Sequence, residues 1–325
     1  MKPETIYSRA VSRLAPHSFV IKAAIPFNRS PRDAMNPKFI ITVLLCIALT
    51  SLSAPICCAT SADADPYAEL KRRLNHDGYP ASHIRSLFEP PPPLQYRLIS
   101  KTFAIRESKL NYEQFLSSSS LSIARRNLAR YASAFDRAER LYQVHRSVIA
   151  AIILVETRFG GYTGETPTLA VLSTYAVMNQ PEHQNRIWSL LSGRDRKRWS
   201  REAFEKRLLQ RSEWAYPEVC ALLKLYETQG LRVESLRGSV MGAFGWPQFL
   251  PSSLMRYGVD GNGNGAVDLD DPEDAITSVA SYLSAHGWVN ARTAPQQEEV
   301  IHKYNKSRPY VQTVLAIATR LASGD

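Results

Sequence analysis

The sequence contains few cysteines, and their positions leave little scope for covalent cross-links. Three of the four, Cys46, Cys57 and Cys58, lie in or beside an apolar leader within the first 64 residues. Residues 65–325 contain only Cys220, so an internal disulfide is excluded there. The apolar residues that follow Cys220 favour a place in the core over a nucleophilic role. The seven histidines show no metal-ligand spacing.

A hydrophobic run long enough to span a bilayer is also missing. The apolar stretch Phe39 to Leu49 follows Met35-Asn-Pro-Lys38 and is short of the ~20 residues that a transmembrane helix needs. It has the form of a secretory signal, with small residues for cleavage at Cys57–Ala59 and Ala62–Ala64. We therefore predict that residues 1–64 are a leader region with a signal peptide, that translation starts at Met35, and that the protein is exported.

The residues around Cys57 and Cys58 argue against a lipid anchor. Such an anchor requires a small residue directly before the modified cysteine, but Ile56 precedes Cys57 and Cys57 precedes Cys58. We favour a cleaved, unanchored protein, with a lipid tether as the alternative.

A strong charge of one sign is absent from the remainder of the chain. Residues 65–325 carry 33 Lys and Arg against 27 Asp and Glu. This small excess does not indicate nucleic acid, and we expect no nucleic-acid partner. With 44% hydrophobic and 22% charged residues, the composition is typical of a folded soluble protein and excludes a disordered or polytopic membrane chain.

Alternating strand patterns are rare beyond the leader, whereas helical spacing of apolar residues is common. Short helices are predicted near Ala68–Leu74 and Ser82–Phe88. The serines at Ser117–Ser120 predict the start of a longer helix whose apolar residues run from Leu128 to Tyr142. The basic stretch Arg194–Arg211 predicts a surface helix. We therefore expect a mainly α fold.

One carboxylate falls on an apolar helix face. Residues 145–159 read HRSVIAAIILVETRF, and Glu156 follows Ile149, Ile152 and Ile153 by seven, four and three residues, which places it on their face. Burial can raise a carboxyl pKa by roughly 3–5 units, which would make Glu156 a general acid. The following glycines, Gly160 and Gly161, predict the helix end and an accessible position for the acid.

The alternative for Glu156 is a buried ion pair with a distant Arg or Lys. Arg158 cannot be that partner locally, because a side chain two residues away points to another face of the helix.

A second segment, residues 238–253, reads GSVMGAFGWPQFLPSS. Trp246 and Phe249 are candidate platforms for a sugar ring, and the Gln248 carboxamide can both donate and accept hydrogen bonds. These groups suit an N-acetylated sugar. Taken alone, the segment is equally compatible with glycine turns around core aromatics.

The segment Asp260 to Asp271, DGNGNGAVDLDD, fits a twelve-residue calcium loop. The predicted ligands are Asp260, Asn262, Asn264, the Ala266 carbonyl, Asp268 through a water molecule, and Asp271. Aspartate replaces the usual glutamate at position twelve, so we expect a weak site that stabilises and positions without taking part in chemistry. The alternative is a glycine-rich hairpin turn. Asp271-Pro272-Glu273-Asp274 also predicts a helix start, with the buried stripe Ile276, Val279, Ala280 and Leu283 after it.

Four segments in order, ETRFG, GSVMGAFGWPQFLPSS, VDGNGNGAVDLDDPEDAITSVASYLSAHGW and YNKSRPY, closely resemble the membrane-bound lytic murein transglycosylase B family of the lysozyme-like superfamily. The resemblance implies a catalytic region at 65–325 with a lysozyme-like α core at about 121–290, smaller lobes and a calcium loop. It also implies a periplasmic enzyme acting on peptidoglycan. The implied reaction cleaves the β-1,4 bond between N-acetylmuramic acid and N-acetylglucosamine without water and leaves 1,6-anhydromuramoyl ends.

The resemblance also implies roles for single residues. Glu156 matches the catalytic acid. The matching substrate-binding positions are Ser239, Gln248, Tyr282, Tyr304, Tyr310 and, with less similar flanking residues, Tyr112. We expect peptidoglycan strands as the partner of a monomeric protein, with cell-wall synthesis proteins as further candidate partners.

A single acid suffices if the sugar's own 6-hydroxyl attacks the anomeric carbon, because Glu156 can first donate and then accept a proton. Hydrolases commonly use two carboxylates, and neither cleft motif contains a second one. An acid from elsewhere, such as Glu165, would instead favour a water-using muramidase. The other alternative is a non-catalytic, calcium-dependent wall-binding protein.

Overall fold

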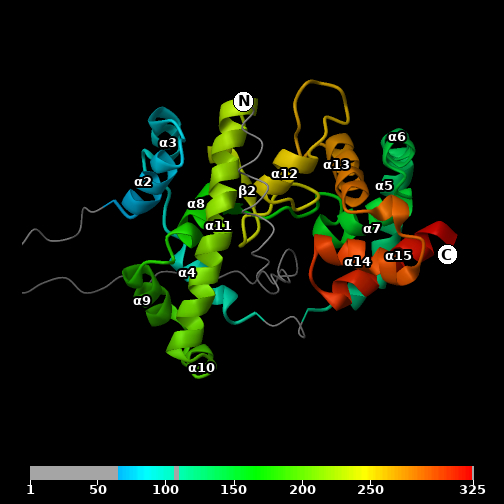
Figure 1. Ribbon diagram of the computed structural model, residues 1–325. Helices are drawn as coiled ribbons and strands as arrows, with labels where there is room; N and C mark the ends of the chain where they lie inside the picture. The colour runs from blue at the N-terminus through cyan, green and yellow to red at the C-terminus, as the bar shows by residue number, and fades with distance from the viewer. Residues whose placement is uncertain (1–64, 106–109, 324–325) are drawn as a thin grey trace, which may run out of the picture. The chain divides into compact units, whose positions relative to one another are not determined.

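The computed structural model describes residues 65–105 and 110–323, and most of this part of the chain is helical (Figure 1). The helices are α2 (Ala68–His76), α3 (Ala81–Phe88), α4 (Tyr96–Thr102), α5 (Ser118–Arg130), α6 (Ala132–Tyr142), α7 (Arg146–Thr157), α8 (Thr168–Ala176), α9 (Pro181–Leu190), α10 (Gly193–Arg196), α11 (Arg201–Gln229), α12 (Pro251–Tyr257), α13 (Pro272–Ala285), α14 (Ala294–Tyr304) and α15 (Arg308–Ser323). Short 3₁₀ helices are η4 (Glu113–Leu116), η5 (Val233–Ser235) and η6 (Trp288–Asn290). The predicted leader, with Met35, lies outside the described residues.

The strands β1 (Thr166–Pro167) and β2 (Arg237–Gly238) form an antiparallel pair, with Thr166 opposite Gly238. This pair joins the chain after α7 to the start of the glycine-rich segment 238–253.

The buried apolar side chains form two clusters, and the glycine-rich segment contributes to both. One cluster gathers α2, α3, α4, α8, α9 and α11, and it includes Met241. The other gathers η4, α5, α6, α7 and α12 to α15, and it includes Phe244 and Phe249. The glycine-rich segment therefore lies where the two clusters meet.

Helix α7 confirms the predicted apolar face. Ile149, Ile152 and Ile153 are fully buried, as is nearly every residue from Ser147 to Thr157. The helix ends earlier than the glycines predict, because Arg158 already has left-handed backbone geometry with φ of 53°. The amide of Arg158 donates to Leu154 O at 3.0 Å, which completes the last turn.

The predicted helix start at Ser117 is confirmed, since the Ser117 hydroxyl accepts the Ser120 amide as an N-cap. The single helix predicted to follow it is wrong. The chain breaks at Tyr131, between α5 and α6, where the tyrosine ring packs edge-on against Trp246 at 5.9 Å. A contact so distant in sequence leaves no trace in helical periodicity.

The basic stretch Arg194–Arg211 lies mostly at the surface, as predicted, but it is not a single helix and one of its charges is buried. The stretch is divided between α10 and α11, and Arg211 is only 3% exposed. Its guanidinium donates to Thr102 Oγ1 at 2.8 Å and lies 4.6 Å from the Phe103 ring centre. Packing of α4 against this face of α11 buries a charge that the composition places at the surface.

Helix α13 begins as predicted. The Asp271 carboxylate accepts the amides of Glu273 and Asp274, and Pro272 occupies the first turn. The predicted buried stripe on this helix, Ile276, Val279, Ala280 and Leu283, is confirmed. Cys220 is buried in α11, as predicted.

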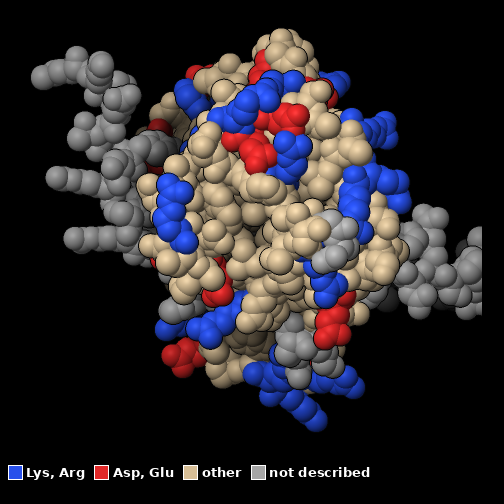
Figure 2. All heavy atoms as spheres, turned by 90° about the vertical axis from the view of Figure 1, so that its right-hand side faces the viewer, with Lys and Arg blue, Asp and Glu red and all other residues tan. Residues whose placement is uncertain are grey.

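Among the described helices, none combines the length and apolar character that a membrane span requires. Figure 2 shows one face, where separate groups of Lys and Arg surround a centre made mainly of uncharged residues.

Candidate active site

The end of α7 and the start of α15 bring a carboxyl group and a phenol together. Tyr310 OH donates a hydrogen bond to Glu156 Oε1 at 2.8 Å. Glu156 is 2% exposed and Tyr310 is equally buried. Burial, followed by the nearby charge of Glu156, raises the pKa of Tyr310 well above its ordinary value of 10. Tyr310 therefore remains a protonated donor to Glu156 near neutral pH.

Tyr304, at the end of α14, lies beside the same acid. Burial raises the pKa of Tyr304 well above 10, and the charge of Glu156 raises it further. The Tyr304 hydroxyl donates to Pro247 O at 2.5 Å, so it joins the YNKSRPY segment to the glycine-rich segment. Two segments far apart in the chain thus meet at Glu156.

Tyr282 on α13 extends this aromatic group. Its ring lies 4.8 Å from that of Tyr304 and stacks on His286 at 4.0 Å. Its hydroxyl donates to Lys303 O at 2.9 Å, and burial raises the pKa of Tyr282. This hydrogen bond holds the last turn of α14, directly before Tyr304, and so supports the position of Tyr304.

Phe249 is not a sugar platform, and that prediction is wrong. The side chain is 1% exposed, and its ring packs against Tyr282 and Tyr304 at 5.7 and 5.9 Å. It belongs to the core that supports the tyrosines. Trp246, the other predicted platform, remains half-buried and lies edge-on to Tyr131 and Phe159.

Thr157 connects the acid's helix to the glycine-rich segment, a role that the sequence pattern did not reveal. Its hydroxyl donates to Trp246 O at 2.9 Å and accepts the Gly160 amide at 3.1 Å. A Cβ atom on Gly160 would lie 2.1 Å from Trp246 Nε1, so only glycine permits this approach. Its φ of 77° also favours glycine.

Gln248 is buried, with a left-handed φ of 50°. Its side-chain Nε2 donates to Thr163 O at 2.9 Å and to Gly245 O at 3.0 Å, which uses both amide hydrogens. Within the described part of the chain, its Oε1 accepts no hydrogen bond. The Gln248 amide nitrogen therefore holds the turn after α7, and its Oε1 remains able to accept a hydrogen bond from a ligand.

Ser239 and Tyr112 differ in their relation to the acid. The Ser239 hydroxyl accepts the amides of Met241 and Ala243 and so stabilises its own turn. The Tyr112 ring lies edge-on to Tyr310 at 6.4 Å. The structure thus gathers Tyr112, Tyr304 and Tyr310 around Glu156 and leaves Ser239 in the glycine-rich turn.

Glu165, the alternative second acid, is exposed in the turn before β1. Glu156 is the carboxylate whose charge raises the pKa of both Tyr304 and Tyr310. The geometry therefore centres on a single buried acid with a phenol donor, which suits proton donation and return by one group.

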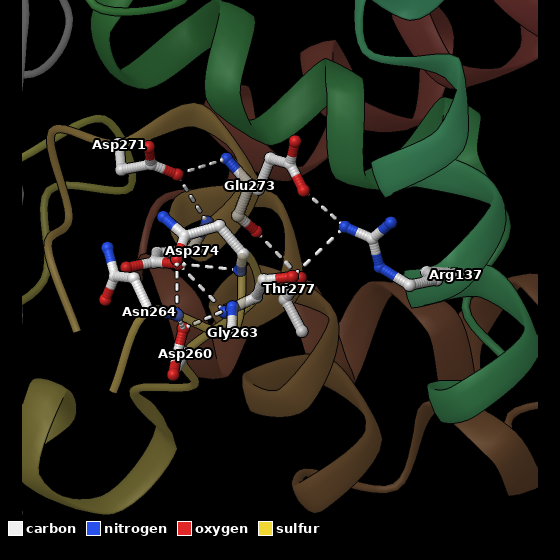
Figure 3. A network of polar contacts seen from close by, with 10 residues as sticks. Arg137, Asp260, Gly263, Asn264, Asp271, Glu273, Asp274 and Thr277 are labelled. Carbon is white, nitrogen blue, oxygen red and sulfur yellow. Dashed lines mark hydrogen bonds and ion pairs between the residues drawn. The ribbon is translucent and has the colours of Figure 1, made fainter. Parts of the chain in front are cut away.

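The predicted metal loop is closed by hydrogen bonds to its own backbone (Figure 3). The two Asp260 oxygens accept the amides of Gly263 and Gly265 at 2.7 Å each. Asn262 and Asn264 each accept the amide two residues further on. Asp268 accepts the Asp270 amide in the same way. Asp260 Oδ1 also accepts the Asn264 amide at 3.1 Å, so two loop amides share this oxygen. The side chains that line the loop are all oxygen donors of the kind that calcium prefers.

Asp274 holds this loop and was not predicted to do so. It is 0% exposed, and its oxygens accept the amides of Gly261, Asn262 and Asp268 at 2.8, 3.2 and 2.7 Å. Burial raises the pKa of Asp274, although these backbone hydrogen bonds act in the opposite direction. An acid in the first turn of a helix suggests capping, but nothing local shows that it turns toward the preceding loop.

The metal loop is also attached to α6. Arg137 donates to Gly261 O at 3.0 Å and pairs with Glu273 (Figure 3). Among the described residues, no three or more His, Cys, Asp or Glu side chains are gathered to hold a metal ion. The predicted acids of the loop are therefore spread along it, with Asp271 engaged in capping α13.

The solved structures that this fold resembles include lytic transglycosylases. The soluble lytic transglycosylase SltB1 from Pseudomonas aeruginosa matches with a TM-score of 0.62 and 24% identity, covering 79% of this chain and 98% of that one. The mainly α, lysozyme-like fold class predicted from the sequence is confirmed.

Residues 62–297 match the family described as the transglycosylase SLT domain, and the chain belongs to this family. Membrane-bound lytic murein transglycosylase B from Escherichia coli (strain K12) is 37% identical over 159 residues, covering 49% of this chain. The match spans 36% of that relative's length. The resemblance noted from the four segments is thereby confirmed.

Two further structures with this fold contain ligands. Escherichia coli lytic transglycosylase Slt35 in complex with calcium has a TM-score of 0.57 and 20% identity, covering 81% of this chain and 94% of that one. SltB3 from Pseudomonas aeruginosa in complex with NAG-NAM-pentapeptide has a TM-score of 0.61 and 19% identity, covering 79% and 78%. At these identities the likeness concerns the fold.

Proposed function

We propose that this protein is a lytic transglycosylase that cleaves the β-1,4 bond between N-acetylmuramic acid and N-acetylglucosamine in peptidoglycan without water. The observation that carries the proposal is the hydrogen bond from Tyr310 OH to the buried Glu156 Oε1, and Glu156 lies within the residues that match the transglycosylase SLT domain. Such an acid is shielded from water and has a fixed orientation.

In the proposed reaction, Glu156 protonates the glycosidic oxygen as the bond to the anomeric carbon of the muramic acid breaks. The sugar's 6-hydroxyl then bonds to that carbon and gives its proton to the Glu156 carboxylate. The acid is restored and a 1,6-anhydro ring forms. The Tyr310 hydroxyl supports the carboxylate between the two transfers, because a hydrogen bond to the charged form favours that form.

Two features support an N-acetylated glycan as the substrate. The Gln248 Oε1 accepts no hydrogen bond from the described residues, so it is available to the N–H of an acetamido group. The related fold of SltB3 binds NAG-NAM-pentapeptide. A water-using muramidase is the second candidate, and a non-catalytic wall-binding protein is the third.

Purified sacculi digested with the wild type, Glu156→Gln and Glu165→Gln test these candidates, with soluble products weighed by mass spectrometry. We expect anhydro ends from the wild type and from Glu165→Gln, and a loss of at least a hundredfold for Glu156→Gln, since general acid–base groups contribute about 10²–10⁴-fold. Reducing ends would favour the muramidase, and no release would favour the binding protein. Undiminished release by Glu156→Gln would overturn the assignment of the acid.

We further propose that the loop Asp260–Asp271 binds calcium in a structural role. The oxygens at alternating positions and the calcium complex of Slt35 support this proposal. The residues that would hold the ion are Asp260, Asn262, Asn264, the Ala266 carbonyl, Asp268 and Asp271. Titration calorimetry with calcium should show weak binding that Asp260→Ala removes, and chelator should lower the melting temperature. No binding heat and an unchanged melting temperature would remove calcium from this proposal.

The export proposal concerns residues 1–64, which lie outside the described part. We propose a cleaved signal peptide and a periplasmic location, on the sequence pattern after Met35. The intact mass of the protein recovered from periplasmic extract should correspond to a start near residues 59–65, without added lipid.

A further inference from the structure

Arg158 follows Glu156 by two residues, and its side chain leaves α7 to contact the segment that carries Tyr112. Arg158 Nη1 donates to Ser120 Oγ at 3.1 Å, and Nη2 donates to Gln114 Oε1 at 3.2 Å. Its guanidinium carbon lies 5.0 Å from the centre of the Phe115 ring. One side chain thus contacts η4 at two residues and α5 at a third.

The contacted segment is internally connected. The hydroxyls of Ser117 and Ser120 both donate to Gln114 O at 2.8 Å, and the Phe115 amide donates to Tyr112 O at 3.1 Å. A displacement of Gln114 or Ser120 would therefore also move Tyr112, because a single turn of backbone connects them.

Tyr112 in turn contacts the group around the acid. Its ring lies edge-on to Tyr310 at 6.4 Å, and Tyr310 OH donates to Glu156 Oε1. The contacts therefore run from Arg158 through η4 and Tyr112 to Tyr310 and back to Glu156. The first and last residues of this series, Arg158 and Glu156, are only two positions apart at the end of α7.

The backbone at Arg158 gives a second, independent observation. Its φ of 53° and ψ of 45° lie in the left-handed region, where glycine is the favoured residue at a helix C-terminus. Arginine costs more than glycine in this conformation. The hydrogen bonds and the ring contact of the Arg158 side chain offset the cost of this backbone conformation.

We propose that Arg158 is a positioning residue for the reaction proposed above, on which this inference rests. By holding η4 against the end of α7, Arg158 sets the Tyr112 ring against Tyr310. The Tyr310 hydroxyl is thereby kept directed at Glu156 Oε1 while the acid loses and regains its proton. Arg158 itself does not contact the reacting atoms.

Arg158→Gly tests this role without imposing strain, because glycine suits the left-handed backbone. Arg158→Lys keeps the charge but has a single ammonium in place of a planar fork that reaches two acceptors. Arg126→Gln on the exposed face of α5 is the matched control. Each variant is assayed for kcat, KM, pH–rate profile and melting temperature.

We expect kcat of Arg158→Gly to fall at least tenfold with KM nearly unchanged, and the alkaline limb of its pH–rate profile to move to higher pH, because the Glu156 carboxylate loses a well-directed donor. Arg158→Lys should fall between Arg158→Gly and the wild type, and Arg126→Gln should match the wild type. Gln114→Ala should shift the profile in the same direction, and adding it to Arg158→Gly should cause no further loss.

A pH–rate profile that stays unchanged in Arg158→Gly overturns the proposal, whether kcat is retained or falls in step with the melting temperature. Independent losses from Gln114→Ala and Arg158→Gly would also overturn it. If the wild type releases no anhydro products, the proposed function fails and this inference fails with it. If the wild type is active and only the Arg158 results disagree, the function stands.

Discussion

A carboxyl group that is shut away from water must be neutral or must have a donor, and Glu156 has one in Tyr310. The Tyr310 hydroxyl stays protonated, because burial and the charge of Glu156 both raise the pKa of Tyr310. The residues that follow the acid fix the backbone around it. Thr157 holds Trp246 O, and Gly160 lets the indole approach.

Replacing Tyr310 by phenylalanine should lower kcat by about ten- to a hundredfold, since a hydrogen bond to a charged group contributes about 1.5–3 kcal/mol. The alkaline limb of the pH–rate profile should move upward, because the carboxylate loses the hydroxyl that stabilises it. Steady-state rates on soluble glycan strands between pH 4 and 9 measure both effects. Tyr226→Phe, on α11, is the control and should behave as the wild type. Equal profiles for all three proteins would exclude Tyr310 from the proposed chemistry.

Gly160→Ala should lower the free energy of unfolding by about 1–3 kcal/mol, because its new Cβ would overlap the Trp246 indole. Thermal unfolding followed by circular dichroism measures the loss. The neighbouring Gly161→Ala is a close control, since its Cβ would meet nothing nearer than 3.4 Å. Similar melting temperatures for the two variants would contradict the close approach seen here.

At the scale of elements, the metal loop is coupled to two helices. Asp274, in the first turn of α13, binds three loop amides, and Arg137 of α6 binds Gly261 O. The loop therefore has a defined conformation through protein contacts, to which a bound calcium ion would add. Helix α13 also carries Tyr282, whose ring packs against Tyr304. The loop that precedes α13 is therefore connected through this helix to the residues around Glu156.

Asp274→Asn should destabilise the protein by about 1–3 kcal/mol, because its amide nitrogen would face backbone N–H groups that need an acceptor. The melting temperature should fall by several degrees with chelator present, which separates this effect from calcium binding. Glu299→Gln, at an exposed position of α14, is the control. Unchanged melting of Asp274→Asn in chelator would show that these three hydrogen bonds add nothing to stability.

At the scale of the whole molecule, stability should fall as the pH is lowered from 7.5 to 5. His183 is buried in α9 and is hydrogen-bonded to Tyr96 OH, and burial lowers the pKa of His183 below its ordinary value of 6.5, although Glu182 opposes this. Burial lowers the pKa of His286 as well. The stabilisation from keeping these rings neutral is present above pH 6.5 and is lost as the pH falls through the lower folded-state values.

Melting temperatures at half-unit steps of pH, for the wild type and His183→Gln, test this expectation. The wild type should lose stability on acidification, and His183→Gln should lose less over the same interval, because glutamine takes up no proton. Parallel curves for the two proteins would show that His183 does not contribute to the pH dependence.

The amino-acid sequence determined the features that depend on neighbours a few residues apart. The buried face of α7 with Glu156, the Ser117 cap and the start of α13 at Asp271 are all local, and all are present. The membership of the family was likewise evident from four segments in order. The break at Tyr131 was not predicted. The Tyr131 ring packs there against Trp246, 115 positions away, and helical periodicity holds no information on such a contact.

Tertiary structure alone decided which groups meet. Tyr310 reaches Glu156 across 154 positions, Phe249 turns into the core, and the charge of Arg211 is buried beneath α4. Helical periodicity records which face of a segment is apolar, but it holds no information on which other segment covers that face. The partner of the acid was therefore a matter of long-range packing, whereas the acid itself was a matter of local spacing.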